Sequence, residues 1–166
     1  MYHRLWTILN GLIVLISIVY IWVVRPHDSS LVVLGQLLAQ VAMILFLVNI
    51  NMYFIFLVIR KSPVRKIKIR LAKFSRYMMK WHIPIAVLGT SIIVGHAAVN
   101  LYAIAPLIGL GHLKLWSGLA ALGMLAVTLF GGWMRHKKAS GFRRKFHLTA
   151  AMTFLVVFLI HMFIPV

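Results

Sequence analysis

The sequence contains no cysteine and only one acidic residue, Asp28. Without cysteine the chain cannot form a disulfide, a thiolate metal site, an iron–sulfur cluster or a covalent c-type haem link. With one carboxylate it cannot use a pair of acids for proton transfer. Any bound metal must therefore be held mainly by histidine, of which the chain has eight.

What the sequence does contain is apolar surface. Hydrophobic residues make up 63% of the 166 positions and the mean hydropathy is +0.98, which is typical of a chain whose solvent is the bilayer. A membrane span needs roughly 20 helical residues. Five apolar stretches are long enough, so we predict an all-α, polytopic membrane helix bundle with spans at about 5–24, 32–59, 82–105, 115–134 and 146–165.

The first and second spans have particular features. The stretch at 5–24 is longer than the core of a signal peptide and is not followed by a small-residue cleavage site, so we predict a retained helix. The stretch at 32–59 exceeds one span, so its helix is expected to tilt or to project into the cytoplasm.

Positive charge is distributed unequally between the connections. Most of the 18 lysine and arginine residues lie in segments 60–81 and 135–145, which the positive-inside rule places in the cytoplasm. Arg4 agrees with a cytoplasmic N-terminus, and five crossings then put Val166 outside. We expect a multi-pass protein of a bacterial plasma membrane that contacts anionic lipid rather than nucleic acid. In this topology the third and fifth helices run parallel.

Two pairs of histidines share one spacing. His82 and His96 are 14 positions apart in the third span, and His147 and His161 are 14 apart in the fifth. Fourteen residues correspond to about 21 Å of helix axis and return to nearly the same face. Because the helices are expected to be parallel, His82 is predicted to lie level with His147 on the inner side, and His96 with His161 on the outer side.

This arrangement predicts two bis-histidine sites, each suited to a b-type haem, stacked between the third and fifth helices. The propionates of the inner haem would seek cations. Cations adjoin the inner pair at Arg76, Lys80, Arg143, Arg144 and Lys145.

The midpoint of each pair supports the same hypothesis. Gly89 lies seven positions from both His82 and His96, and Phe154 lies seven from both His147 and His161. A glycine lets a flat group approach the backbone, and a phenyl ring between two haems would exclude water. Each residue alone is equally typical of ordinary helix packing.

The four histidines resemble a known pattern. Residues 82–165 look like the transmembrane domain of the ferric reductase and NADPH oxidase superfamily, whose third and fifth helices carry His-x13-His pairs. The resemblance implies that electrons pass from a cytoplasmic flavin through an inner haem and an outer haem to ferric iron or oxygen outside. The chain departs from that family in having no flavin or nicotinamide domain and no Gly-x-Gly-x-x-Gly run. We therefore expect the donor to be a separate flavoprotein, or a quinol as in cytochrome b561-like proteins.

Other interpretations remain open. The same histidines could conduct protons or a divalent metal in a transporter or channel, although metal transport usually recruits carboxylates. The chain could also be a structural subunit of a larger complex, with histidines that only reach the headgroup region. His112, in the short outer segment, is either a solvated histidine or a group that binds an anionic acceptor or delivers protons.

Overall fold

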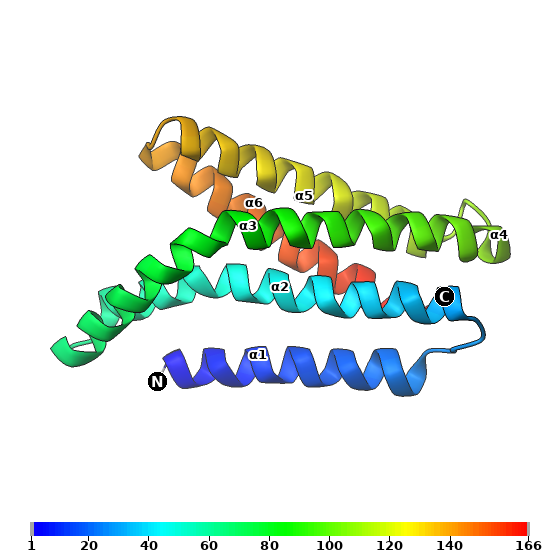
Figure 1. Cartoon of the computed structure of the whole chain (residues 1–166), viewed down its shortest axis with the longest axis horizontal. Helices are drawn as coiled ribbons and strands as arrows, with labels where there is room; N and C mark the ends of the chain where they lie inside the picture. Colours follow the sequence, from blue (N-terminus) through cyan, green and yellow to red (C-terminus); the bar gives the residue numbers. More distant parts are fainter. Residues whose placement is uncertain (1, 166) are drawn as a thin grey trace. The chain divides into compact units, whose positions relative to one another are not determined.

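The computed structural model describes residues 2–165, with side chains from Leu5 onward, and every regular element in this range is helical. Five helices are long and apolar enough to cross a membrane, which confirms the predicted all-α fold and is consistent with a multi-pass membrane protein. Arg4 and Val166, which the topology argument uses, lie outside the described side chains. The elements, labelled in Figure 1, are α1 (Tyr2–Val19), η1 (Tyr20–Val24), α2 (Ser30–Lys61), α3 (Arg65–Ala103), α4 (Ala105–Ile108), α5 (Leu113–Lys137) and α6 (Gly141–Phe163).

The helix starts follow local capping chemistry. The Ser29 hydroxyl accepts a hydrogen bond from Val32 N at 3.2 Å and begins α2. The Ser140 hydroxyl accepts one from Arg143 N at 3.2 Å and begins α6. Each cap satisfies one of the backbone donors that a helix N-terminus leaves free.

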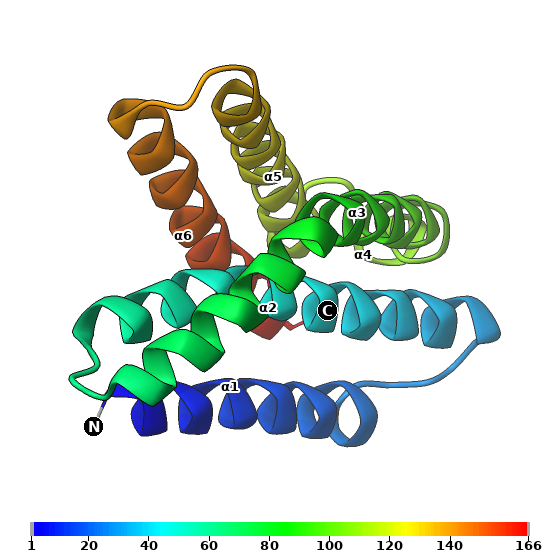
Figure 2. The same cartoon turned by 60° about the vertical axis from the view of Figure 1, so that its left-hand side comes forward.

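The third helix begins earlier than the apolar stretch that it contains. Segment 60–81, expected as a basic loop of which part could form an amphipathic helix on the inner leaflet, is helical from Arg65. The α3 helix therefore has 39 residues and a length of about 58 Å. This exceeds the thickness of a bilayer core by about a factor of two. Figures 1 and 2 show that the basic first half of α3 is bent away from the apolar second half. Pro84 lies inside the helix and supplies the reason, because proline removes one hydrogen bond and its ring crowds the preceding turn.

The chain forms two compact units, Met1–Asn100 and Leu101–Val166. We call them the N-terminal unit and the C-terminal unit. The N-terminal unit contains α1, α2 and most of α3, whereas the C-terminal unit contains α4, α5 and α6.

In the N-terminal unit, α1 and α2 run antiparallel (Figure 1). Polar side chains join the two helices. Gln40 Nε2 donates to the fully buried Ser17 hydroxyl at 3.3 Å, and Asn51 Nδ2 donates to Asn10 Oδ1 at 2.9 Å. The Trp6 indole also donates to Asn51 and stacks on Phe54. Interhelical hydrogen bonds of this kind stabilise membrane helix pairs.

In the C-terminal unit, α5 and α6 form an antiparallel hairpin (Figure 2). The two helices approach closely at Gly131. A Cβ at this position would lie 3.1 Å from His147 Cα and 3.0 Å from Phe146 Cδ1. Glycine at such a position lets two backbones come together. This close approach brings the side chains of α6 against the main chain of α5.

Candidate functional site

The four predicted histidines are divided equally between the two units. His82 and His96 lie on α3 in the N-terminal unit, and His147 and His161 lie on α6 in the C-terminal unit. All four side chains are half-buried. Each pair is therefore described within its own unit.

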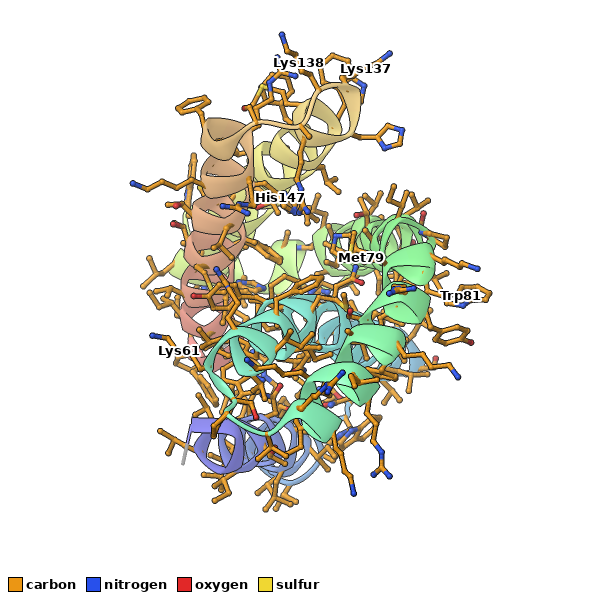
Figure 3. All side chains as sticks on the ribbon, turned by 90° about the vertical axis from the view of Figure 1, so that its left-hand side faces the viewer. Lys61, Met79, Trp81, Lys137, Lys138 and His147 are labelled. Carbon is orange, nitrogen blue, oxygen red and sulfur yellow. The ribbon has the colours of Figure 1, made fainter. Side chains whose placement is uncertain are left out.

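His147 is held by α5. Its Nδ1 lies 3.0 Å from the main-chain oxygen of Thr128. A carbonyl oxygen can only accept, so the ring must donate and Nδ1 carries the proton. The ring also lies against Gly132, where a Cβ would meet His147 Cε1 at 3.3 Å. Figure 3 shows His147 on α6, and Lys137 and Lys138 at the end of α5.

His161 is held by the other end of α5. Its Nδ1 lies 2.9 Å from the Ser117 hydroxyl, and that hydroxyl donates to Lys114 O at 3.0 Å. A serine has one proton to donate, and when that proton goes to Lys114 O the hydroxyl oxygen accepts from His161, so that Nδ1 carries the ring proton. The ring packs on Gly118, where a Cβ would lie 3.1 Å from His161 Cε1.

The two contacts of α5 repeat with the spacing of the histidines. Gly118 and Gly132 are 14 positions apart, as are His161 and His147, and each glycine lies against one imidazole. In an antiparallel pair equal spacings on both helices give equivalent contacts at two depths. The sequence carried this signal, but it could be interpreted only once the register of α5 and α6 was known.

His96 is held by α2 in the N-terminal unit. Its Nδ1 lies 2.8 Å from Gly35 O, so here too the imidazole must donate. The Asn100 amide nitrogen lies 3.1 Å from the same Nδ1 and donates to His96 O at 2.7 Å.

His82 lies close to the bend of α3. Asn49 on α2 donates through Nδ2 to the main-chain oxygen of His82 at 3.1 Å. This bond fixes the backbone of α3 against α2 two residues before Pro84. The α2 helix thus contacts both histidine positions of the N-terminal unit, as α5 does in the C-terminal unit.

The two midpoint residues are both buried. A Cβ built on Gly89 would lie 3.6 Å from Leu45 Cβ, an ordinary contact, so Gly89 packs against α2. Phe154 is 2% exposed, and its ring lies 6.0 Å from that of Phe158. The contact of Gly89 fits helix packing, and the placement of either residue beside a haem stays a prediction.

The cations assigned to the inner haem differ in their surroundings. Arg76 and Lys80 are exposed on the basic half of α3. Arg143 is half-buried, and its Nη1 donates to Met134 O at 2.8 Å and Lys138 O at 3.4 Å, where it caps the end of α5. A propionate would have to share the Arg143 guanidinium with these carbonyls.

Sequence reasoning did not single out Lys114. Lys114 is buried, and its Nζ donates to the main-chain oxygens of His161 at 2.6 Å, Met162 at 3.3 Å and Ile164 at 2.7 Å. Three acceptors match the three protons of an ammonium, and the C-terminus of a helix attracts a cation. The available signal was one isolated lysine at the start of an otherwise apolar stretch.

His112 has a structural role. It precedes α5, and its Nδ1 accepts from Lys114 N at 3.1 Å, so it is the N-cap of that helix. With Nδ1 accepting, a neutral imidazole carries its proton on Nε2. The tautomer is thus the opposite of that of His96, His147 and His161.

Between residues 5 and 165 no group of three or more histidine or acidic side chains comes together. Comparison with known proteins found no matching family model, curated protein or solved structure. The arrangement of the histidines is therefore judged on its own chemistry.

Proposed function

We propose that this chain transfers electrons across a membrane through two b-type haems, each held by two histidines. His82 and His147 are the ligands of the inner haem, and His96 and His161 are the ligands of the outer haem. The pairing follows from the equal spacing and from the parallel direction that five crossings give to α3 and α6.

The observation that carries the proposal is the hydrogen bonding of the imidazole Nδ1 atoms. In His96, His147 and His161 the Nδ1–H is used in a hydrogen bond to the neighbouring helix. In a neutral imidazole this puts the lone pair on Nε2, an atom that can bind iron. In His96 the Asn100 amide nitrogen lies 3.4 Å from Nε2, so a haem would have to displace this contact. Ligating histidines characteristically donate their other ring nitrogen to a carbonyl or a similar acceptor, which fixes the orientation of the ring. The residues present thus fit a haem with two axial imidazoles.

The chain itself supplies binding, orientation and exclusion of water. A bound haem would supply a centre that accepts and releases one electron. Gly35, Ser117 and Thr128 provide the acceptors that orient three of the four rings. The apolar helices keep water from the interior of the bundle, and Arg76 and Lys80 remain available for propionates on the inner side.

The partners in this proposal follow from the direction of transfer. A separate cytoplasmic flavoprotein or a membrane quinol donates the electrons, and an acceptor such as ferric iron or oxygen receives them outside. The basic first half of α3 contacts anionic lipid, since lysine and arginine beside a span are attracted to the inner leaflet. The N-terminus lies in the cytoplasm of a bacterial cell and the C-terminus lies outside.

The experiment is spectroscopic. Protein purified from haem-replete cells is expected to show a Soret band that shifts on reduction and the α band of a low-spin bis-imidazole haem. A pyridine haemochrome assay should give about two haems per chain. A colourless preparation would refute the proposal and favour a transporter or a structural subunit.

Single variants test the pairing. His161→Ala and His96→Ala should each remove the outer haem, giving about half the haem content, while the inner haem stays reducible. His136→Ala is the matched control, because His136 is exposed at the end of α5. Full haem content in both ligand variants, or equal loss in the control, would show that the pairing is wrong.

A further inference from the structure

The two histidines of α6 face different chemistry on α5, although their contacts are related by 14 residues. Fourteen positions after Ser117 the chain has Gly131, and fourteen after Lys114 it has Thr128. His161 therefore meets a hydroxyl where His147 meets a main-chain carbonyl. The inner contact shows what the outer one would be without the serine.

Ser117 stands between His161 and the main chain of α5. Its hydroxyl accepts from His161 Nδ1 at 2.9 Å and donates to Lys114 O at 3.0 Å. The equivalent carbonyl at the inner position, Thr128 O, bonds directly to His147 Nδ1 at 3.0 Å. An amide carbonyl is a stronger acceptor than a hydroxyl, so it gives its imidazole more basic character. A more basic ligand stabilises ferric over ferrous iron and lowers the reduction potential.

Lys114 adds a fixed positive charge to the outer position. Its ammonium is buried and lies 2.6 Å from the main-chain oxygen of His161. Reduction removes one positive charge from the iron, so a cation nearby favours the reduced form. A charge shielded from water acts more strongly than an exposed one.

Cations also lie near the inner position, but they are less buried. Arg135 and Arg143 are half-buried, and Lys137 and Lys138 are exposed. Their fields are weakened by water, dissolved ions and anionic headgroups. Because Lys114 is more buried than these cations, it exerts the stronger local field, and this field acts on the His161 end of α6.

We propose that Lys114 and Ser117 are positioning residues that give the outer haem a higher reduction potential than the inner haem, so that α5 sets the direction of electron flow from inside to outside. This inference rests on the proposed function. It concerns residues of α5 that contact a ligand rather than the haem itself.

The test is a redox titration of the purified, haem-loaded protein, followed in the α band and by electron paramagnetic resonance. The signal of the outer haem is assigned from its absence in His96→Ala. Lys114→Met should lower the equilibrium constant for reduction of the outer haem by about tenfold. For a one-electron couple this corresponds to a reduction potential lower by about 59 mV. Lys114→Arg should retain the charge and most of the potential, and the inner haem should be unaffected.

Ser117→Gly reproduces the inner arrangement at the outer position, because it lets His161 Nδ1 bond to Lys114 O. It should lower the reduction potential of the outer haem by less than Lys114→Met. The hydrogen bonds from Lys114 to the main-chain oxygens at the end of α6 should remain. Ser91→Ala is the control, since Ser91 is exposed and its hydroxyl bonds only to Val87 O in its own helix.

The outcomes separate the inference from the proposed function. Wild-type protein without haem refutes both. Protein with two haems whose outer potential is unchanged in Ser117→Gly, or shifts equally with the inner potential in Lys114→Met, refutes the inference alone. Loss of the outer haem from Ser117→Gly would also overturn it, because the hydroxyl would then be required for binding. If Lys114→Met fails to fold, Ser117→Gly decides the question.

Discussion

The α2–α3 pair and the α5–α6 pair each support two histidines 14 residues apart, but they do so by different means. In the C-terminal unit, glycines bring two backbones together, and the histidines of α6 bond to groups on α5. In the N-terminal unit, α2 contacts α3 through side chains such as Leu45 and Asn49, and through Gly35 O, which accepts from His96 Nδ1. Histidine bonds to the main chain of a neighbouring helix thus occur in both pairs, and α5–α6 differs in placing Gly131 directly against the main chain at His147 Cα.

This difference predicts different tolerance to change. A backbone contact cannot move away from an added side chain, whereas a side chain can often rotate. The C-terminal unit should therefore be sensitive to the size of a few glycines, and the N-terminal unit to the loss of amide groups. The predictions below follow that contrast, beginning with the largest effect.

The strongest test is Gly131→Val. Its side chain would meet His147 Cα at 3.1 Å and the Phe146 ring at 3.0 Å, so α5 and α6 would have to separate. We expect a loss of about 1–3 kcal/mol in the free energy of unfolding, as for other overpacked sites. Unfolding in mixed detergent and dodecyl sulfate micelles measures this. Gly123→Val, in the same helix with nothing within 4 Å of its Cβ, is the control and should change stability little.

The matching test of the N-terminal unit is Asn51→Leu. This change removes the hydrogen bonds of Asn51 with Trp6 and Asn10 but keeps an apolar side chain of similar size. Interhelical bonds in membranes average about 0.6 kcal/mol each, so a loss of about 1 kcal/mol is expected. The same micelle titration, followed by tryptophan fluorescence, would detect it. Stability equal to that of the Ser91→Ala control would contradict a role for the amide in joining α1 to α2.

The smallest expected effect comes from adding one methyl group at a glycine of each helix pair. Gly118→Ala places a methyl group 3.1 Å from His161 Cε1, whereas Gly89→Ala places one 3.6 Å from Leu45. We expect Gly118→Ala to turn the His161 ring and alter the electron paramagnetic resonance of the outer haem. Gly89→Ala should gain up to about 1 kcal/mol from helix propensity, because its methyl group makes an ordinary contact. An unaltered spectrum in Gly118→Ala, or a loss of stability in Gly89→Ala, would contradict this difference between the two helix pairs.

Much of the architecture follows from local features of the sequence. The five helices were predicted from apolar stretches, and the starts of α2 and α6 coincide with Ser29 and Ser140. The full extent of α3 was not predicted, because the basic segment 60–81 was expected to be a loop with at most a separate amphipathic helix in it. Helix propensity of lysine, arginine and leucine continues α3 through that segment, and Pro84 bends the helix without ending it.

The candidate site was predicted only in part. His82, His96, His147 and His161 were identified from their spacing, but the groups that hold them were not. Lys114 was not singled out, and it is buried against the end of α6. His112, considered as a binding group, caps α5.

The sequence by itself determined that five segments are apolar and long enough to span a bilayer. It also determined that the two histidines of each pair lie 14 residues apart. Both properties depend on neighbouring residues along one helix, namely summed hydropathy and helical periodicity. Only the tertiary structure decided that Gly132 lies against His147, that Gly118 lies against His161, and that each ring donates through Nδ1. Those contacts depend on the register between two antiparallel helices, which close packing of glycines and side chains sets and which no single helix contains.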